Sequence, residues 1–290
     1  EGVNINKSSR VAWSQNCSDC LESRFLLSCV GCQNCFGCVN LRHKSYYFLN
    51  EQLSKEEWIR RVFEIAGSYS KTEDFKNKFA EFSLKFPRRE NTNLKTLNCS
   101  GDYILESKNC KNCFEVAFAE NFKNCFSSKK GKDIFDCLGH CIDAELLYEC
   151  VGVGYSSKVI GSWWVNNSQN IEYCLAIRGC HDCFGCEAVN NAKFSILNKS
   201  YTEEEYKKIR NHIVEELKQK NLYGSFMPPE LSFFAYNESI SYNNMPLSKE
   251  EAIAEGFRWE DNIPRTKGQE TIQLENIADH INDVPDNITK

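Results

Sequence analysis

Residues 110–141 read CKNCFEVAFAENFKNCFSSKKGKDIFDCLGHC, and Cys113, Cys125 and Cys137 in this stretch are twelve positions apart. If one extra residue is allowed near Cys141, the same row continues through Cys150, Ser162, Cys174 and Cys186. Rows offset by three, six and nine positions are equally constant in their apolar or small character. An inward residue at every third position fits neither the period of an α-helix nor that of a flat strand.

The same frame describes residues 8–44, where Cys17, Cys29 and Leu41 form one row. Gly, Asn and Asp at outward positions favour the left-handed backbone that a tight corner needs. Such residues directly precede frame cysteines at Asn34, Asn112, Asn124, Asp136 and Asp182. We therefore expect a mainly β fold, a right-handed β-solenoid with coils of about twelve residues, interrupted and flanked by short α-helices.

A longer module occurs twice. Residues 31–50 read GCQNCFGCVNLRHKSYYFLN, and residues 179–198 read GCHDCFGCEAVNNAKFSILN. A helix-like segment follows each copy, and a Ser or Thr three positions before a Glu predicts a capping box at its start. These pairs are Ser54 with Glu57 and Thr202 with Glu205, and a third pair is Ser248 with Glu251.

The pattern divides the chain into five segments. We predict a first solenoid segment at 1–50, a helical insertion at 51–97, a second solenoid segment at 98–200, a helix plus extended aromatic tail at 201–260, and a linker-like C-terminal segment at 261–290. In the insertion, phenylalanines recur at helical spacing before Pro87. In the tail, residues 223–244 are expected to be extended and to pack on the solenoid.

Composition limits the classes of function. The 290 residues carry a net charge of −5 with 26% charged residues, so charge does not support a nucleic-acid partner. No apolar stretch approaches the length of a membrane helix, and the polar first ten residues do not resemble a signal peptide. We expect a cytoplasmic protein, and a chain without an initiator methionine suggests a piece of a longer one.

The seventeen cysteines have three interpretations. The favoured one treats them as small apolar residues that fill a narrow interior. In a second, residues six apart face each other across a coil and form disulfides, namely Cys29–Cys35, Cys32–Cys38 and Cys180–Cys186. In a third, three-residue spacing provides ligands for zinc or an iron–sulfur cluster, although the repeat alone produces that spacing. The candidate metal ligands are Cys29, Cys32, Cys35, Cys38, Cys180, Cys183 and Cys186.

No catalytic or cofactor-binding motif is present, and a narrow solenoid interior has no room for a small-molecule pocket. His140, His181 and His212 stand alone in the sequence, and the pair Arg60–Arg61 is typical of a solvated face. The sequence thus predicts a non-enzymatic scaffold that presents a rigid surface to a protein partner. The alternatives are a metal-binding or redox protein using the CxxC clusters, and a nucleic-acid-associated protein, which the pI of about 5.7 disfavours.

Three stretches support a resemblance that covers nearly the whole chain. They are residues 34–58, which include NCFGCVNLRHKSYYFLN and SKEEW, residues 224–238, GSFMPPELSFFAYNE, and residues 246–261, PLSKEEAIAEGFRWED. With them the chain resembles a family of uncharacterised cysteine-rich repeat proteins of candidate-phyla bacteria. The resemblance implies zinc-finger-like segments before and after this central region, and the tail ADHINDVPDNITK resembles the linker before the last of them. It implies no established activity.

Overall fold

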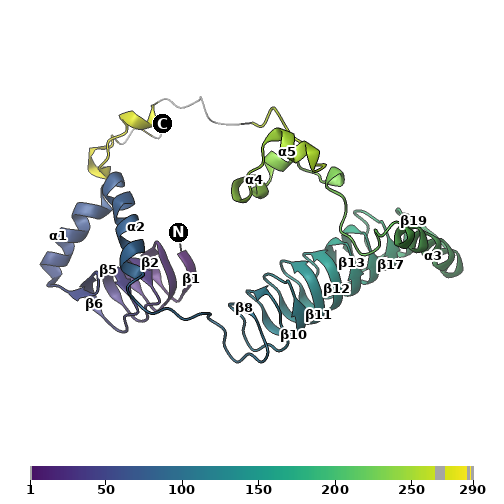
Figure 1. Cartoon of the computed structure of the whole chain (residues 1–290), viewed down its shortest axis with the longest axis horizontal. Helices are drawn as coiled ribbons and strands as arrows, with labels where there is room; N and C mark the ends of the chain where they lie inside the picture. The colour runs from purple at the N-terminus through teal and green to yellow at the C-terminus, as the bar shows by residue number, and fades with distance from the viewer. Residues whose placement is uncertain (1, 265–271, 286–287, 289–290) are drawn as a thin grey trace. The chain divides into compact units, whose positions relative to one another are not determined.

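The computed structural model describes residues 2–264, 272–285 and 288, so part of the predicted linker-like segment, residues 265–271 among it, lies outside the described residues. The chain divides into two compact units, one of residues 1–88 with 264–290 and one of residues 89–263. Each unit contains a stack of short parallel strands with helices attached (Figure 1). The prediction of a mainly β protein with several short helices is therefore confirmed.

In the first unit, parallel strands pair with a constant offset of twelve residues, so that Val11 lies opposite Ser23 and Leu26 opposite Cys38. Figure 1 shows them in purple and blue. The strands are β1 (Gly2–Asn6), β2 (Ser9–Ala12), β3 (Ser14–Ser18), β4 (Leu21–Leu27), β5 (Gln33–Val39) and β6 (Ser45–Phe48). The short strand β7 (Glu51–Gln52) turns back and pairs antiparallel with β6.

The second unit has the same offset in most of its pairs. It has an eleven-residue step at its start, where Leu94 lies opposite Leu105, and a thirteen-residue step at the predicted extra residue, where Cys137 lies opposite Cys150. Its strands are β8 (Gly101–Asp102), β9 (Cys113–Phe114), β10 (Ala117–Lys123), β11 (Lys129–Leu138), β12 (Ile142–Val151), β13 (Ser157–Ile160), β14 (Trp163–Asn166), β15 (Gln169–Glu172), β16 (Leu175–Arg178), β17 (His181–Phe184) and β18 (Lys193–Ile196). Strand β19 (Lys199–Ser200) pairs antiparallel with β18.

Left-handed backbone recurs at nearly every third residue of both stacks, directly before the inward residue. Because this conformation is costly for most L-residues, Asn and Asp are favoured there. Asn34 and Asp182 have φ values of 49° and 54°, as the corner prediction requires. Asn side chains also bond to the next corner, as from Asn112 to Asn124 (3.0 Å) and from Asn124 to Asp136 (2.6 Å). These ladders align successive strands.

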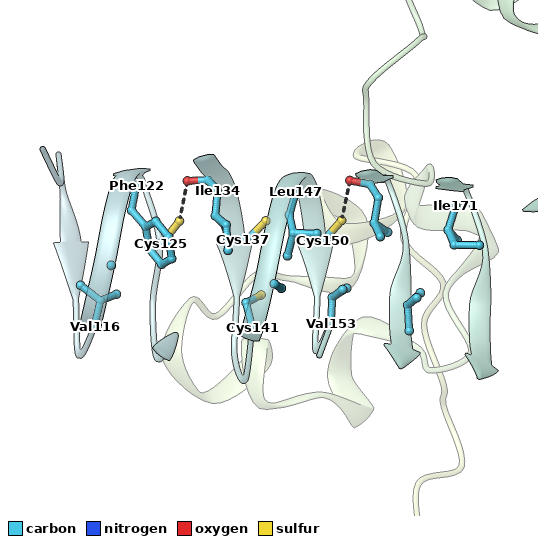
Figure 2. Packing of buried hydrophobic residues seen from close by; sticks show 14 of the residues in the cluster. Val116, Phe122, Cys125, Ile134, Cys137, Cys141, Leu147, Cys150, Val153 and Ile171 are labelled. Atoms are coloured by element: carbon cyan, nitrogen blue, oxygen red, sulfur yellow. Dashed lines mark hydrogen bonds between the residues drawn. The ribbon is translucent and has the colours of Figure 1, made fainter. Parts of the chain in front are cut away.

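The residues of the predicted rows point into the stacks. Figure 2 shows the interior of the second unit, where Cys125, Cys137 and Cys150 alternate with larger side chains such as Phe122 and Leu147. Ile134, Val159, Val165 and Ile171 are fully buried in the same cluster.

The helical insertion contains α1 (Lys55–Ala66) and α2 (Tyr69–Ser83). Phe75 of α2 packs on three stack residues, Phe25, Phe36 and Phe48, with ring centroids 4.7–5.8 Å apart. Ser54 caps α1 by accepting from Glu57 N at 3.2 Å. The reciprocal half of the predicted capping box is missing at this helix, because the Glu57 carboxylate accepts hydrogen bonds from two arginines instead.

The C-terminal part of the first unit is not a plain linker where it is described. It contains the 3-10 helices η3 (Leu274–Asn276) and η4 (Ile281–Asp283) and meets the junction between α1 and α2. Asp279 accepts from Ser70 N at 2.7 Å, and Ile281 N donates to Gly67 O at 2.8 Å. Helix ends leave main-chain groups unpaired, and this segment supplies partners to two of them.

In the second unit, α3 (Glu203–Gln219) begins at a complete capping box of Thr202 and Glu205, as predicted. The box at Ser248 opens α5 (Lys249–Ala254). The expectation that residues 223–244 are extended is wrong for most of the segment. Pro229 and its neighbours form short helical turns instead, which are η1 (Pro229–Leu231), η2 (Tyr236–Glu238) and α4 (Ile240–Asn244).

Both copies of the duplicated module end in the same way. Asn50 lies in the turn after β6, and its side chain bonds to both the N–H (2.8 Å) and the C=O (3.0 Å) of Val39. Asn198 after β18 bonds in the same way to Glu187 N and O, both at 2.9 Å. Each side-chain amide thus bonds to the last strand edge as the main chain of a further strand would. Because an exposed strand edge can pair with another chain, this amide helps to close the edge.

Candidate functional site

The thiols of the interior are hydrogen-bond donors. Cys125 Sγ lies 3.2 Å from Lys123 O and 3.3 Å from Ile134 O, so its single S–H proton is shared between these two carbonyls. Figure 2 shows the contact with Ile134. The same two contacts occur at Cys150, at 3.2 and 3.4 Å. Since a buried carbonyl without a partner is costly, a polar side chain small enough for the interior stabilises the coil.

Other inward thiols and the inward serines accept hydrogen bonds from the main chain twelve residues on. Cys180 N donates to Ser168 Oγ at 3.1 Å, and Ala192 N donates to Cys180 Sγ at 3.4 Å, each twelve residues on. An inward side chain of this kind donates a hydrogen bond to a carbonyl two residues before it and accepts one from an N–H twelve residues after it. Among short side chains, only Ser, Thr and Cys can both donate and accept in this way. This role explains the cysteine content beyond simple packing.

The seven predicted metal ligands are all buried in the interiors of the two stacks. Cys29, Cys35 and Cys38 each donate to main-chain carbonyls, for example Cys29 Sγ to Cys38 O at 3.4 Å and Cys38 Sγ to Tyr47 O at 3.5 Å. Binding a metal requires deprotonated thiols and would remove these bonds. Within the described residues, no group of three or more His, Cys, Asp or Glu side chains is arranged to hold a metal ion.

All seventeen cysteines are free, including the residues of the three predicted disulfides. Burial raises the pKa of Cys20 from its ordinary value of 9.0 to about 11. The pKa of Cys29 is also raised. The largest cause is its hydrogen bonds to Cys17 and Cys32, and burial is a smaller one. A thiol held neutral in this way is a weak ligand near pH 7, whereas the pKa of its neighbour Cys32 is lowered because that sulfur accepts hydrogen bonds from Cys29 and Cys35.

The other residues considered for chemistry have ordinary surface partners. Arg60 and Arg61 both pair with Glu57, at 2.8 and 2.7 Å, as expected of a solvated helix face. These bonds, with that of Arg60 the largest contributor, lower the pKa of Glu57 to about 2. His181 is not isolated, since its Nδ1 lies 3.0 Å from Asp182 Oδ2.

A row of large apolar side chains follows the outside of the second stack, and the sequence analysis missed it. Each member lies opposite the next in the strand register, which makes the row continuous. We name it the outer ladder, with the members Phe114, Phe126, Leu138, Val151, Trp163 and Leu175. The relative exposures of Phe114, Phe126 and Leu138 are 43%, 44% and 52%. The twelve-residue spacing of these residues was the available signal, but only the inward rows were followed.

Lysines flank the exposed end of the outer ladder. Lys111 and Lys123 lie three residues before Phe114 and Phe126, and Lys129 and Lys130 follow Phe126; all four are exposed. They form no ion pair within the described residues, whereas Lys108 and Lys132 share Glu120 at 3.2 and 4.0 Å. Lys129 and Lys130 are the first two residues of β11.

The chain itself covers the other end of the outer ladder. Residues 223–234, which we name the strap, leave α3 and cross the stack at Trp163 and Leu175. Gly224 N donates to Tyr173 Oη at 2.7 Å, and Phe233 lies 6.3 Å from Trp163 between ring centroids. A mostly apolar cavity of about 500 Å³ remains between the strap and the stack.

A partly buried ion pair fixes α3 beside the strap. Arg210 of α3 binds Glu172 of the stack through two nitrogens, with Nε at 3.2 Å from Oε2. Tyr223 Oη donates to the same carboxylate at 3.2 Å. Burial raises the pKa of Tyr223 to about 12, so the phenol stays protonated as a donor.

Neither protein-family models nor curated proteins match this chain. No helix among the described residues is both long enough and apolar enough to span a membrane.

Proposed function

We propose that both stacks are right-handed β-solenoids and that the chain is a non-enzymatic scaffold that binds a protein partner. A twelve-residue register, an inward side chain at every third position and a left-handed corner before it support the solenoid. Such coils hold outward residues in fixed rows, as repeat proteins do at their binding surfaces. The interior thiols serve packing and hydrogen bonding in this proposal.

The exposed end of the outer ladder is the observation that carries the scaffold function. Phe114, Phe126 and Leu138 are adjacent in register and each is at least 43% exposed. Isolated exposed apolar residues are common on proteins, but a contiguous row bordered by polar groups is typical of an interaction site.

Photo-crosslinking in cells that produce the protein tests this function. A photo-crosslinking amino acid in place of Phe126 should capture a defined protein, which the same replacement at Phe118 should not. Phe118 is the matched control because it is 48% exposed but lies outside the outer ladder. Equal labelling from both positions, or labelling from neither, would refute the proposal.

A further inference from the structure

We propose that the exposed end of the outer ladder binds an extended, acidic segment of the partner that carries apolar anchor residues. The inference rests on the proposed scaffold function and names the chemistry of its partner. Coils stack at about 4.8 Å, so the rings of Phe114 and Phe126 and the side chain of Leu138 present a continuous apolar strip across three coils.

The strap shows what kind of chain covers this ladder. At Trp163 and Leu175, the cover consists of residues 226–233, which read FMPPELSF and combine aromatic, proline and acidic residues. The uncovered members Phe114 and Phe126 continue the same row. A segment that binds there therefore extends an interface that the protein already forms with itself, and needs similar apolar anchors.

Charge selects an acidic partner. Lys111 and Lys123 lie three residues before Phe114 and Phe126, and Lys129 lies three residues after Phe126. These three lysines pair with no carboxylate in the described residues and outnumber the one exposed carboxylate next to the strip, Glu115, although the whole chain carries a net charge of −5. The nearby carboxylates of Asp133 and Asp136 accept hydrogen bonds from neighbouring Asn side chains. Opposite charges around an apolar core accelerate association and set specificity.

A direct binding measurement on the full chain tests the inference. The probe is a fluorescent peptide with the strap sequence FMPPELSFF between two pairs of aspartates, and the comparison peptide carries lysines instead. We expect the acidic peptide to bind at least about tenfold more tightly, with an affinity that falls as salt rises.

Variants locate the site. Phe114→Ser with Phe126→Ser should weaken binding of the acidic peptide at least about tenfold, because two half-exposed rings lose their burial. Phe118→Ser should change it by less than about twofold, and Lys123→Glu with Lys129→Glu should reverse the preference between the two peptides. Circular dichroism melts of these variants serve as the control, and we expect the same melting temperature as for the native protein because the substituted residues are exposed.

Several outcomes overturn the inference. They are equal binding of the lysine peptide, equal loss in the Phe118→Ser control, absence of binding, or tighter binding of a single-stranded oligothymidylate than of the acidic peptide. Crosslinking from Phe126 separates this failure from failure of the scaffold function. A captured protein with no acidic segment at the crosslink refutes only the inference, whereas no capture refutes the scaffold.

Discussion

Replacement of Ser168 tests whether the inward row is held by hydrogen bonds or only by size. Ser168 Oγ donates to Asn166 O at 2.8 Å and accepts from Cys180 N at 3.1 Å. In Ser168→Ala the Asn166 carbonyl keeps its bond from Gly179 N, but the buried Cys180 N–H loses its acceptor. An orphaned buried donor costs about 2 kcal/mol, which makes local opening about 30-fold more frequent.

The matched variant is Ser168→Cys. One coil further, Cys180 Sγ has the same role, since it donates to Arg178 O and accepts from Ala192 N, both at 3.4 Å. Ser168→Cys should therefore cost less than about 1 kcal/mol. Ser157→Ala is the control for a serine outside the inward rows.

Amide hydrogen exchange at Cys180, followed by NMR, provides the measurement, because protection reports the free energy of local opening. Protection should fall about 30-fold in Ser168→Ala and stay near the native value in Ser168→Cys and Ser157→Ala. If Ser168→Ala and Ser168→Cys lose the same protection, the side-chain hydrogen bond is not what stabilises the row.

Three further predictions concern the cap, the ion pair and the thiols. Asn198→Ala removes two hydrogen bonds to the main chain of Glu187 and should lower the free energy of unfolding, measured by urea denaturation, by about 2 kcal/mol. Asn198→Asp keeps an acceptor for Glu187 N and should lower it by less. Arg210→Met leaves the Glu172 carboxylate without its charged partner and should lower the free energy of unfolding by about 2–3 kcal/mol. Adding Glu172→Gln should recover most of this loss. If the double variant instead loses the sum of the two single-variant losses, the two residues are not coupled. The pKa of Cys20 is raised from 9.0 to about 11, so the native state holds this proton more tightly than the unfolded state does. The contribution of Cys20 to stability should therefore be present below pH 9 and fall by about 1 kcal/mol by pH 10, and the fall measured for Cys20→Ser should be smaller than that of the native protein by this amount. Thiol titration at pH 8 should find the sixteen buried cysteines reactive only after unfolding, while the partly buried Cys99 can react earlier. Bound metal in the same sample would favour the metal-binding alternative.

Periodicity made the interior predictable. A side chain that points inward must be small or apolar in every coil, so the rows of Cys113 and Cys17 follow from the sequence alone. The helix starts at Thr202 and Ser248 were equally clear, because a capping box is a local pattern. These features depend on residues close in sequence or separated by a fixed step.

Features that depend on contacts between distant segments were not predictable. Residues 223–244 were expected to be extended, but they form short helical turns, and the Tyr236 hydroxyl bonds to Met245 O across the last of these turns. The contact between Asp279 and Ser70 joins residues more than two hundred positions apart, and no periodic signal connects them. The outer ladder had a periodic signal, yet exposed rows are less restricted in composition than buried ones, so exposure could only be read from the structure.

The two duplicated modules give a physical argument for the outer surface as a docking surface. In the first unit, the outward residues Phe36 and Phe48 are buried because Phe75 of α2 lies on them. In the second unit, the corresponding Phe184 and Ile196 are buried under α3. Wherever the described chain covers an apolar row outside a stack, the cover is a segment with aromatic anchors. Phe114 and Phe126 form a row of the same kind without such a cover, so a second chain with those anchors would complete the pattern.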